Sequence, residues 1–504
     1  MDVRLMTRQQ VVAALPALAL WIGAGVVWGQ PTTEAPAVTT PAGTASTDAP
    51  VDKYEAQRIA GDDAYRDGDY DKAITTLSLL LAELPNDHVA LYLRGSARVE
   101  LGTNKQDAAM IREGIADARA AITELSKTDE GLNADYYLPY LYGMSQLAAV
   151  ENRKEHAEQA IKIAQQVLGR TGIEDFQKAN LYYQKALLHT QLNQINEAGF
   201  ALQSAIDKDP EHLAAHVALC DMFARNNSPE DAKAQFDRSI ALLPEEPLLY
   251  NNRGMFLQSV GRKSEAVADF DKALQLNPEL VAAWTNRGFT RLQAAEAVAA
   301  EADLNKSIEL DATQHVPWSL RASARLQQGK MDAALADFRK VIEMQPNMPS
   351  AHYDLGFALF FNKDYAKASE SFNEAVRLNP SMLFLEPWRY TSMVFAGQQE
   401  EAAKVFAPIA EKKVEDRVWF DILTLYVMGK LEDSEVLMAV KNTDPAGRNA
   451  QMCEAYYFIG LRTASRKDAE GAKAFFEQAL ATNAIPLSAY RGAQYALQKF
   501  SKGE

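Results

Sequence analysis

One pattern recurs every 34 residues between Pro247 and Met382, and it constrains the fold more than any other feature of the chain. Four positions of the repeat, called places here, keep this spacing. The first is mostly aromatic, the second, four residues later, holds a small residue, the third holds Ala and the fourth holds a large apolar residue. Their occupants are Tyr250, Trp284, Trp318 and His352; Gly254, Gly288, Ala322 and Gly356; Ala266, Ala300, Ala334 and Ala368; and Phe270, Leu304, Phe338 and Phe372. Self-similarity at a fixed period of this length predicts a repeat architecture.

Each copy has the residue pattern of a helical hairpin. Tyr250 and Gly254 lie on one face of a first helix, and Gly261 is placed to end that helix in a turn. Ala266 and Phe270 mark the inner face of a second helix, so small residues let the two helices approach closely. One hairpin cannot bury its apolar face alone, and we therefore expect neighbouring copies to stack.

The order aromatic, small, Ala, large apolar, small and Pro resembles the signature of the tetratricopeptide repeat. The resemblance extends, with weaker copies, over about 430 residues or roughly twelve copies. It implies an all-α fold: a right-handed α-solenoid of about twelve stacked helix-turn-helix units with a C-terminal capping helix. It also implies an interaction scaffold whose partner is a protein or peptide of unknown identity.

The chain divides into six predicted segments. These are 1–29, an export signal or membrane anchor; 30–53, a Pro-, Thr- and Ala-rich linker; 54–178, repeats with insertions; 179–382, six regular repeats; 383–486, divergent repeats; and 487–504, a capping helix and tail. About seven extra residues are expected near Thr103 to Met110, and Pro408 is expected to kink or end a second helix.

The first 29 residues have the features of an export signal. Arg4 and Arg8 precede an apolar run from Val11 to Trp28, and small residues at its end suit cleavage before Gln30. The run is nearly long enough to cross a bilayer, so an uncleaved anchor that tethers the chain to a membrane is the alternative. In both cases the repeats are predicted to be extracytoplasmic, in a periplasm or secreted.

Composition argues against several classes of function. A formal net charge of −15 is unsuited to nucleic-acid binding, which requires a basic face. Cys220 and Cys453 are the two cysteines, too few for a disulfide framework or a cysteine zinc site. His212 and His216 are one helical turn apart, but no third metal ligand is evident, and His216 occupies the aromatic place of its repeat. No catalytic motif is present, so we predict neither enzyme activity nor a cofactor.

A charged pair recurs with the repeat. Arg253, Arg287 and Arg321 share one place, and Asp269, Asp303 and Asp337 share another. Where the next copy has Leu355 in place of Arg, it also has Ser371 in place of Asp. We interpret this as an ion pair between the two helices of a copy, with a structural role. An exposed pair of this kind contributes about 0–1 kcal/mol.

A group of aromatic residues is the first candidate binding site. In tetratricopeptide proteins the first helices line the concave groove, and the matching places in one copy hold Tyr353, Phe357, Phe360 and Phe361. Phe384 and Phe395 add to them in the next copy. A contiguous apolar surface of this kind is typical of an interaction site. The alternative is that these side chains pack between adjacent repeats.

Three asparagines form a second, polar candidate. Asn252 and Asn286 occupy equivalent places, and Asn251 is beside the first. An amide can donate and accept hydrogen bonds, which suits it to hold a peptide backbone, although a solvated helix face explains these residues as well. Peptide binding in the groove is thus the expected function. An architectural role in an envelope or secreted assembly and binding of glycans are the alternatives.

Overall fold

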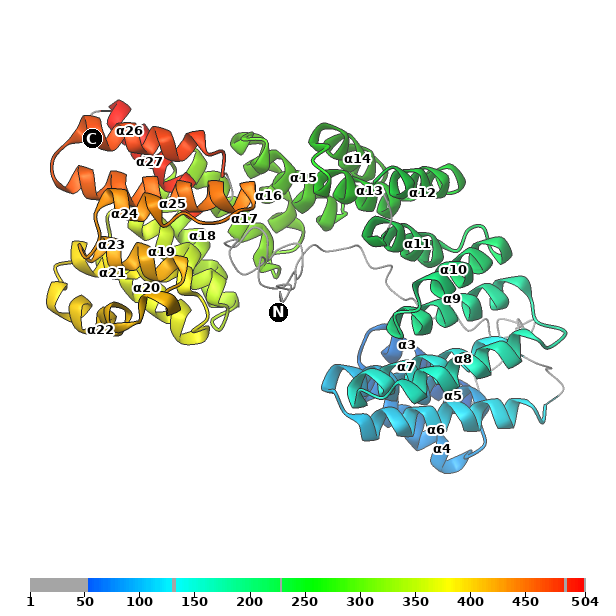
Figure 1. Cartoon of the computed structure of the whole chain (residues 1–504). Helices are drawn as coiled ribbons and strands as arrows, with labels where there is room; N and C mark the ends of the chain where they lie inside the picture. Colours follow the sequence, from blue (N-terminus) through cyan, green and yellow to red (C-terminus); the bar gives the residue numbers. More distant parts are fainter. Residues whose placement is uncertain (1–52, 129–132, 227–228, 485–486, 503–504) are drawn as a thin grey trace, which may run out of the picture. The chain divides into compact units, whose positions relative to one another are not determined.

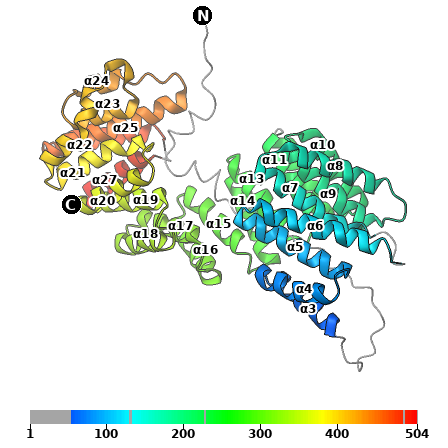
Figure 2. The ribbon, with the colours of Figure 1, turned by 90° about the horizontal axis from the view of Figure 1, so that it is seen from below.

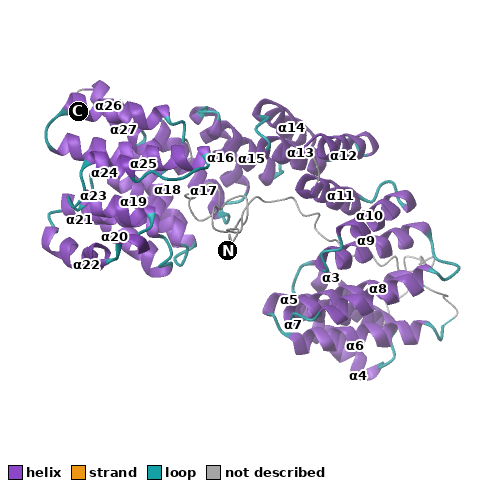
Figure 3. Cartoon of the chain, in the orientation of Figure 1, coloured by secondary structure: helices purple, strands orange, loops and turns teal. Residues whose placement is uncertain are grey.

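The computed structural model describes residues 53–128, 133–226, 229–484 and 487–502. Within these ranges the secondary structure is helical, and no strand occurs (Figure 3). The predicted export signal and nearly all of the linker lie outside the described residues. The chain forms two compact units. The N-terminal unit ends at Arg262 and also includes Gln275–Asn277, and the C-terminal unit begins at Lys263. We describe each unit by itself.

The N-terminal unit consists of successive helical hairpins (Figures 1 and 2). Its helices are α3 (Lys53–Arg66), α4 (Tyr70–Glu83), α5 (His88–Lys105), α6 (Ala108–Leu125), η1 (Ala134–Tyr137), α7 (Leu138–Glu151), α8 (Lys154–Leu168), α9 (Asp175–Gln191), α10 (Ile195–Lys208), α11 (Leu213–Asn226), α12 (Pro229–Leu242) and α13 (Pro247–Ser259). Adjacent first helices also touch, since α5 contacts both α3 and α7.

The C-terminal unit continues the same pattern. Its helices are α14 (Lys263–Leu276), α15 (Val281–Gln293), α16 (Ala297–Leu310), α17 (His315–Gln327), α18 (Met331–Met344), α19 (Pro349–Phe361), α20 (Tyr365–Leu378), η2 (Leu383–Leu385), α21 (Glu386–Phe395), α22 (Gln399–Glu411), η3 (Val414–Asp416), α23 (Trp419–Val427), α24 (Asp433–Met438), α25 (Pro445–Ser465), α26 (Ala469–Ala481) and α27 (Ser488–Lys502). The all-α solenoid predicted from the repeat is confirmed.

The turn between first and second helices has a fixed backbone conformation. Gly261, Gly329 and Gly397 have φ values of 82°, 74° and 83°. Ala295 and Lys363 occupy the same place in the intervening copies and take φ values of 62° and 65°. A left-handed residue at this place ends the first helix and lets its carbonyls be satisfied by the turn. The turn predicted at Gly261 is therefore a property of the repeat place, whichever residue occupies it.

The two helices of a hairpin meet at the small place, as predicted. A Cβ atom added to Gly288 would lie 2.9 Å from Leu304 Cγ of the second helix. At Gly356 it would lie 2.7 Å from the ring of Phe372. Because real Cβ contacts are longer than this, a larger residue would push the helices apart. The apolar place therefore fills the space that the small place leaves.

At two positions where the sequence predicts an irregularity, the structure has continuous helices. The extra residues near Thr103 extend both helices of the hairpin, so that α5 and α6 have 18 residues each. Pro408 lies inside α22, and the helix continues past it to Glu411. Proline removes one hydrogen bond, and near the end of a helix the loss of that bond does not prevent the last turn from forming.

The end of the C-terminal unit is built around Trp388 of α21. Its ring lies 4.9 Å from Phe357 of α19 and 5.0 Å from Tyr457 of α25, between ring centroids. Helix α27 contacts α25, α26 and α19, with Tyr495 against Phe361 at 5.8 Å. Helices that are far apart in sequence thus share one aromatic core. In the part of the chain that the structure describes, no helix is long and apolar enough to span a membrane.

Candidate functional site

The predicted aromatic site is largely inside the protein. Tyr353, Phe357 and Phe360 are buried, with 1%, 4% and 4% of their surface exposed. Phe357 contacts Phe361, Phe372 and Trp388, and Phe360 contacts Tyr365 and Trp388. Phe361 is half-buried against the same tryptophan. These side chains therefore pack between repeats, which is the alternative that the sequence had left open.

Phe384 and Phe395 lie at the edge of the same cluster. Phe384 is half-buried beside Tyr353, at 5.6 Å between ring centroids, and Phe395 is exposed while it stacks on Phe360 at 6.4 Å. With the centre of the cluster closed, these six residues do not form an open apolar surface in this structure. A peptide-binding role for them stays a prediction, and it would require the cluster to open.

The three asparagines are also buried. Asn251 and Asn252 expose 0% and 1% of their surface, and Asn286 exposes 8%. The side-chain nitrogen of Asn251 donates to Oδ1 of Asn252 at 3.1 Å. The side-chain nitrogen of Asn252 has no hydrogen-bond partner among the described residues. A role in holding a peptide backbone stays a prediction for these three residues.

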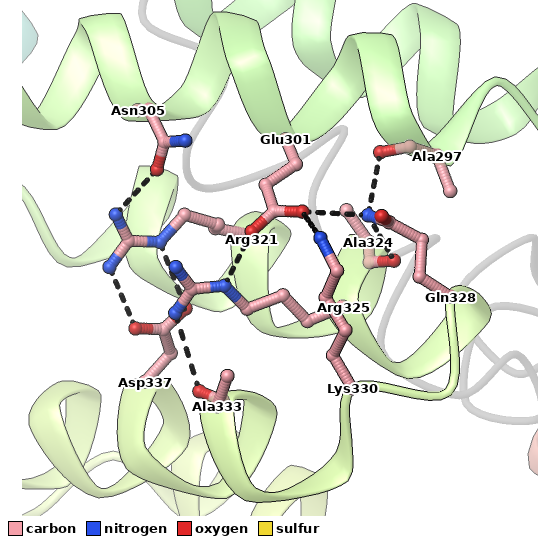
Figure 4. A network of polar contacts seen from close by, with 10 residues as sticks. All are labelled: Ala297, Glu301, Asn305, Arg321, Ala324, Arg325, Gln328, Lys330, Ala333 and Asp337. Atoms are coloured by element: carbon pink, nitrogen blue, oxygen red, sulfur yellow. Dashed lines mark hydrogen bonds and ion pairs between the residues drawn. The ribbon is translucent and has the colours of Figure 1, made fainter.

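The ion pair predicted between the two helices of a copy is present in the copies that carry Arg321 and Arg287. The guanidinium of Arg321 donates to both carboxylate oxygens of Asp337, at 2.9 and 2.8 Å (Figure 4). Arg287 binds Asp303 in the same two-pronged way, at 3.0 and 2.7 Å. The expectation of an exposed pair was wrong, because both carboxylates are buried. A second arginine one turn later, Arg325 in Figure 4, also donates to Asp337, at 2.7 Å.

The same arginines also connect neighbouring repeats. Arg321 donates to Asn305 at 2.7 Å, and Arg287 pairs with Asp271 at 2.5 Å, in each case on the second helix of the preceding copy. Their guanidinium carbons lie 4.6 Å from the rings of Trp318 and Trp284. Each of the three guanidinium nitrogens of both arginines thus donates to a neighbouring side chain. Their role is to join helices, as the sequence had indicated.

Glu301 extends this network to the next turn of the solenoid. It accepts hydrogen bonds from Arg325, Gln328 and Lys330 at 2.7–2.8 Å (Figure 4). Burial raises the pKa of its carboxyl group, but the hydrogen bonds from Lys330, Arg325 and Gln328 outweigh this and bring the pKa down to about 2. The Glu301 carboxylate is thus bound by these three side chains, and its role is structural.

His216 has the packing role expected of its repeat place. Its Nδ1 lies 3.0 Å from Ser239 Oγ, and its Nε2 lies 2.9 Å from the carbonyl oxygen of Pro210. Both ring nitrogens therefore interact with protein atoms and are not available to a metal. Among the described residues no group of three His, Cys, Asp or Glu side chains is arranged to hold a metal ion.

A polar cluster in the first three hairpins of the N-terminal unit was not found from the sequence. Glu100 of α5 is half-buried, and Tyr142 of α7 lies with its hydroxyl 3.4 Å from Oε2 of this carboxylate. Tyr65 at the end of α3 and Tyr70 at the start of α4 stand beside each other, with ring centroids 5.6 Å apart. Burial and then the negative charge of Glu100 raise the pKa of both tyrosines. We call these four residues the Glu100 cluster.

The cluster combines residues from three hairpins at irregular spacings, because α5 and α6 are longer than a standard copy. The 34-residue comparison therefore could not bring them together. The only signal in the sequence is an unusual frequency of tyrosine in the first repeats. In the structure, α5 contacts α3 and α7, so three members of the cluster lie on adjacent first helices, and Tyr70 joins them from the start of α4.

Comparisons with known proteins identify the same repeat that the sequence resembles. One family model described as tetratricopeptide repeat matches residues 183–247 and 320–382, and a second with the same description matches 247–280. No curated protein matches the chain. Three solved structures resemble the chain. MamA 41-end from Desulfovibrio magneticus RS-1 is 22% identical, with 33% of this chain and 94% of that chain covered and a TM-score of 0.31. YrrB, described as a TPR protein with an unusual peptide-binding site, is 22% identical, with 36% of this chain and 94% of that chain covered and a TM-score of 0.31, and yeast Tom70 is 16% identical, with 89% of this chain and 96% of that chain covered and a TM-score of 0.36.

The TM-scores of these structures are low. The family models match regular copies, where the small, apolar and turn places have the geometry described above. The family-model match, the 34-residue period and the packing of the hairpins all indicate the same repeat. Residues 183–280 and 320–382 of this chain are tetratricopeptide repeats.

Proposed function

We propose that this protein is an exported scaffold that binds a partner protein, or an extended peptide, through the face formed by its first helices. Its repeats are consistent with a role in protein–protein interaction. One observation supports the choice of face. In the N-terminal unit, adjacent first helices α3, α5 and α7 touch and present the half-buried Glu100 cluster, whose carboxylate lacks a basic partner among the described residues.

Photo-crosslinking tests this proposal. A photoreactive phenylalanine analogue replaces Gln191, an exposed residue of first helix α9 that contacts Ser145 of first helix α7. The matched control carries the analogue at Phe200 on second helix α10, which is 76% exposed. Both variants are expressed in the producing cell, and the crosslinked products are identified by mass spectrometry.

We expect a defined partner to be crosslinked from position 191 and not from position 200. Crosslinks from position 200 alone would favour the architectural alternative, in which the protein uses its outer faces. The same samples test export, because cleavage of the predicted signal gives a mature chain that begins at Gln30. A chain that retains its first residues and fractionates with the cytoplasm would contradict the proposed location.

A further inference from the structure

The Glu100 carboxylate is in an unusual environment for a charged group. It is half-buried on α5, and its hydrogen bond is a long one from Tyr142. Burial raises the pKa of this carboxyl group, because the charged form loses hydration that the hydrogen bond from Tyr142 only partly replaces. Buried carboxylates are normally paired with a cation or with several hydrogen-bond donors. Glu100 has neither within the described residues.

The basic residues of its own helix are engaged elsewhere. Arg94 and Arg98 of α5 both bind Asp117, at 2.8 and 2.6 Å. Lys105, at the end of the helix, lies 3.6 Å from Asp71. The chain therefore places basic residues close to Glu100 in sequence and pairs each of them with another acid. None of these three basic residues is shown paired with the Glu100 carboxylate.

Three tyrosines from neighbouring helices belong to the Glu100 cluster. Tyr65 and Tyr70 stand at the junction of α3 and α4, and Tyr142 stands on α7. The hydroxyl of Tyr142 lies 3.4 Å from Oε2 of Glu100, and burial and then the negative charge of Glu100 raise the pKa of all three phenols. The faces of aromatic rings attract cations, and a carboxylate beside them adds a charged hydrogen-bond acceptor. Together they suit an ammonium or guanidinium group.

We propose that the Glu100 cluster receives a cationic side chain, of lysine or arginine, from the partner that binds the first-helix face. This inference rests on the proposed function, to which it adds the chemistry of recognition. Once the predicted signal is removed, the cation comes from another molecule, since residues 30–52 contain no lysine or arginine. The net charge of −15 favours the approach of a basic partner.

Small cations test the site without knowledge of the partner. Butylammonium and butylguanidinium are titrated into residues 30–504 whose tyrosine rings carry ¹³C, and the ring signals are followed by NMR. The signals of Tyr65, Tyr70 and Tyr142 are assigned from single Tyr→Phe variants. Butanol serves as the uncharged control. We expect either cation, but not butanol, to shift these three signals in a saturable manner.

The Glu100→Gln variant decides whether the carboxylate is responsible. It keeps the size of the side chain and removes the charge, and we expect the apparent affinity for the cation to fall about tenfold or more. Glu113→Gln is the matched control, because Glu113 is an exposed carboxylate on neighbouring helix α6, and the affinity should not change. An unchanged affinity in Glu100→Gln, or no saturable shift with either cation, overturns the inference.

The two proposals can fail separately. If position 191 yields a partner and Glu100→Gln leaves that crosslink and the titration unchanged, the scaffold function holds and the cation site is wrong. If the cations bind and no partner is crosslinked from position 191, the site is real and the proposed face of the scaffold is wrong.

Discussion

At the scale of single residues, the protein uses charged side chains to hold its helices together. Asp337 is buried and accepts hydrogen bonds from two arginines, each of which also reaches another residue. A buried pair of this kind is costly to break, because the remaining charges lose their partner without regaining water. The natural copy with Leu355 and Ser371 shows that both members can be absent together.

We expect Asp337→Asn to lower the free energy of unfolding by about 3–5 kcal/mol, measured by urea denaturation. The double variant Arg321→Leu/Asp337→Ser copies the natural alternative and should lose less than the sum of its two single substitutions. Strict additivity in this double-mutant cycle would mean that the pair contributes nothing through mutual contact.

The turn place offers a stabilising substitution. Ala295 has a φ of 62°, which costs an L-residue about 1–2 kcal/mol, whereas glycine adopts this conformation freely. After the entropy that glycine adds to the unfolded chain is subtracted, Ala295→Gly should raise stability by about 0.5–1 kcal/mol. The control is Ala294→Gly, where φ is −87° and glycine brings only its entropic cost. Thermal unfolding of the two variants should therefore change in opposite directions.

The buried aromatic cluster gives a prediction that separates packing from binding. Phe357→Ala removes a ring that is 4% exposed and should cost about 3–5 kcal/mol of stability. Phe395→Ala, at 38% exposure, should cost about 1 kcal/mol or less. Circular dichroism during thermal unfolding measures both. Similar and small effects would show that Phe357 is not a core residue.

At the scale of helices, the C-terminal repeats are held by contacts between elements distant in sequence. Helix α27 packs on α25 and α26 and also touches α19, and Trp388 of α21 lies between α19 and α25. Half-buried polar groups also interact within this packing. Trp419 of α23 donates its indole hydrogen to Glu454 of α25 at 2.6 Å. Burial raises the pKa of Glu454 to about 7, although the tryptophan hydrogen bond opposes this shift.

The raised pKa of Glu454 makes the stability of these helices depend on pH. The unfolded carboxyl group titrates near a pKa of about 4.3, so between that value and about 7 the folded state binds more protons. This contribution to stability is fully present below the unfolded pKa and is lost as the pH rises to about 7. Glu454→Gln should flatten the fall in melting temperature between pH 5 and pH 7 relative to the parent. A parallel pH profile would contradict the assignment.

At the scale of the whole molecule, repeats contact their neighbours, and this limits how far a local change spreads. Helix α5 contacts α3, α4, α6 and α7, whereas α17 contacts α15, α16 and α18. Asp337→Asn should therefore increase amide hydrogen exchange in α17 and α18 and leave α5 and α6 as protected as in the parent. Equal loss of protection in α5 would show that the chain unfolds as one cooperative unit.

The sequence alone determined the parts of this protein that depend on neighbours along the chain. The 34-residue period specified the hairpin, its close approach at Gly288 and Gly356, and the partners Arg321 and Asp337, because these contacts recur at constant separations. A left-handed turn at the place of Gly261 followed for the same reason.

Only the tertiary structure decided which side chains are buried and which polar groups meet between hairpins that break the period. The aromatics around Phe357 fit a groove face by position, but the packing of α21, α25 and α27 encloses them. The Glu100 cluster depends on helices α5 and α6 that exceed the standard length, so no constant spacing connects its members. Burial depends on how irregular repeats converge in space, and a period describes regular repeats alone.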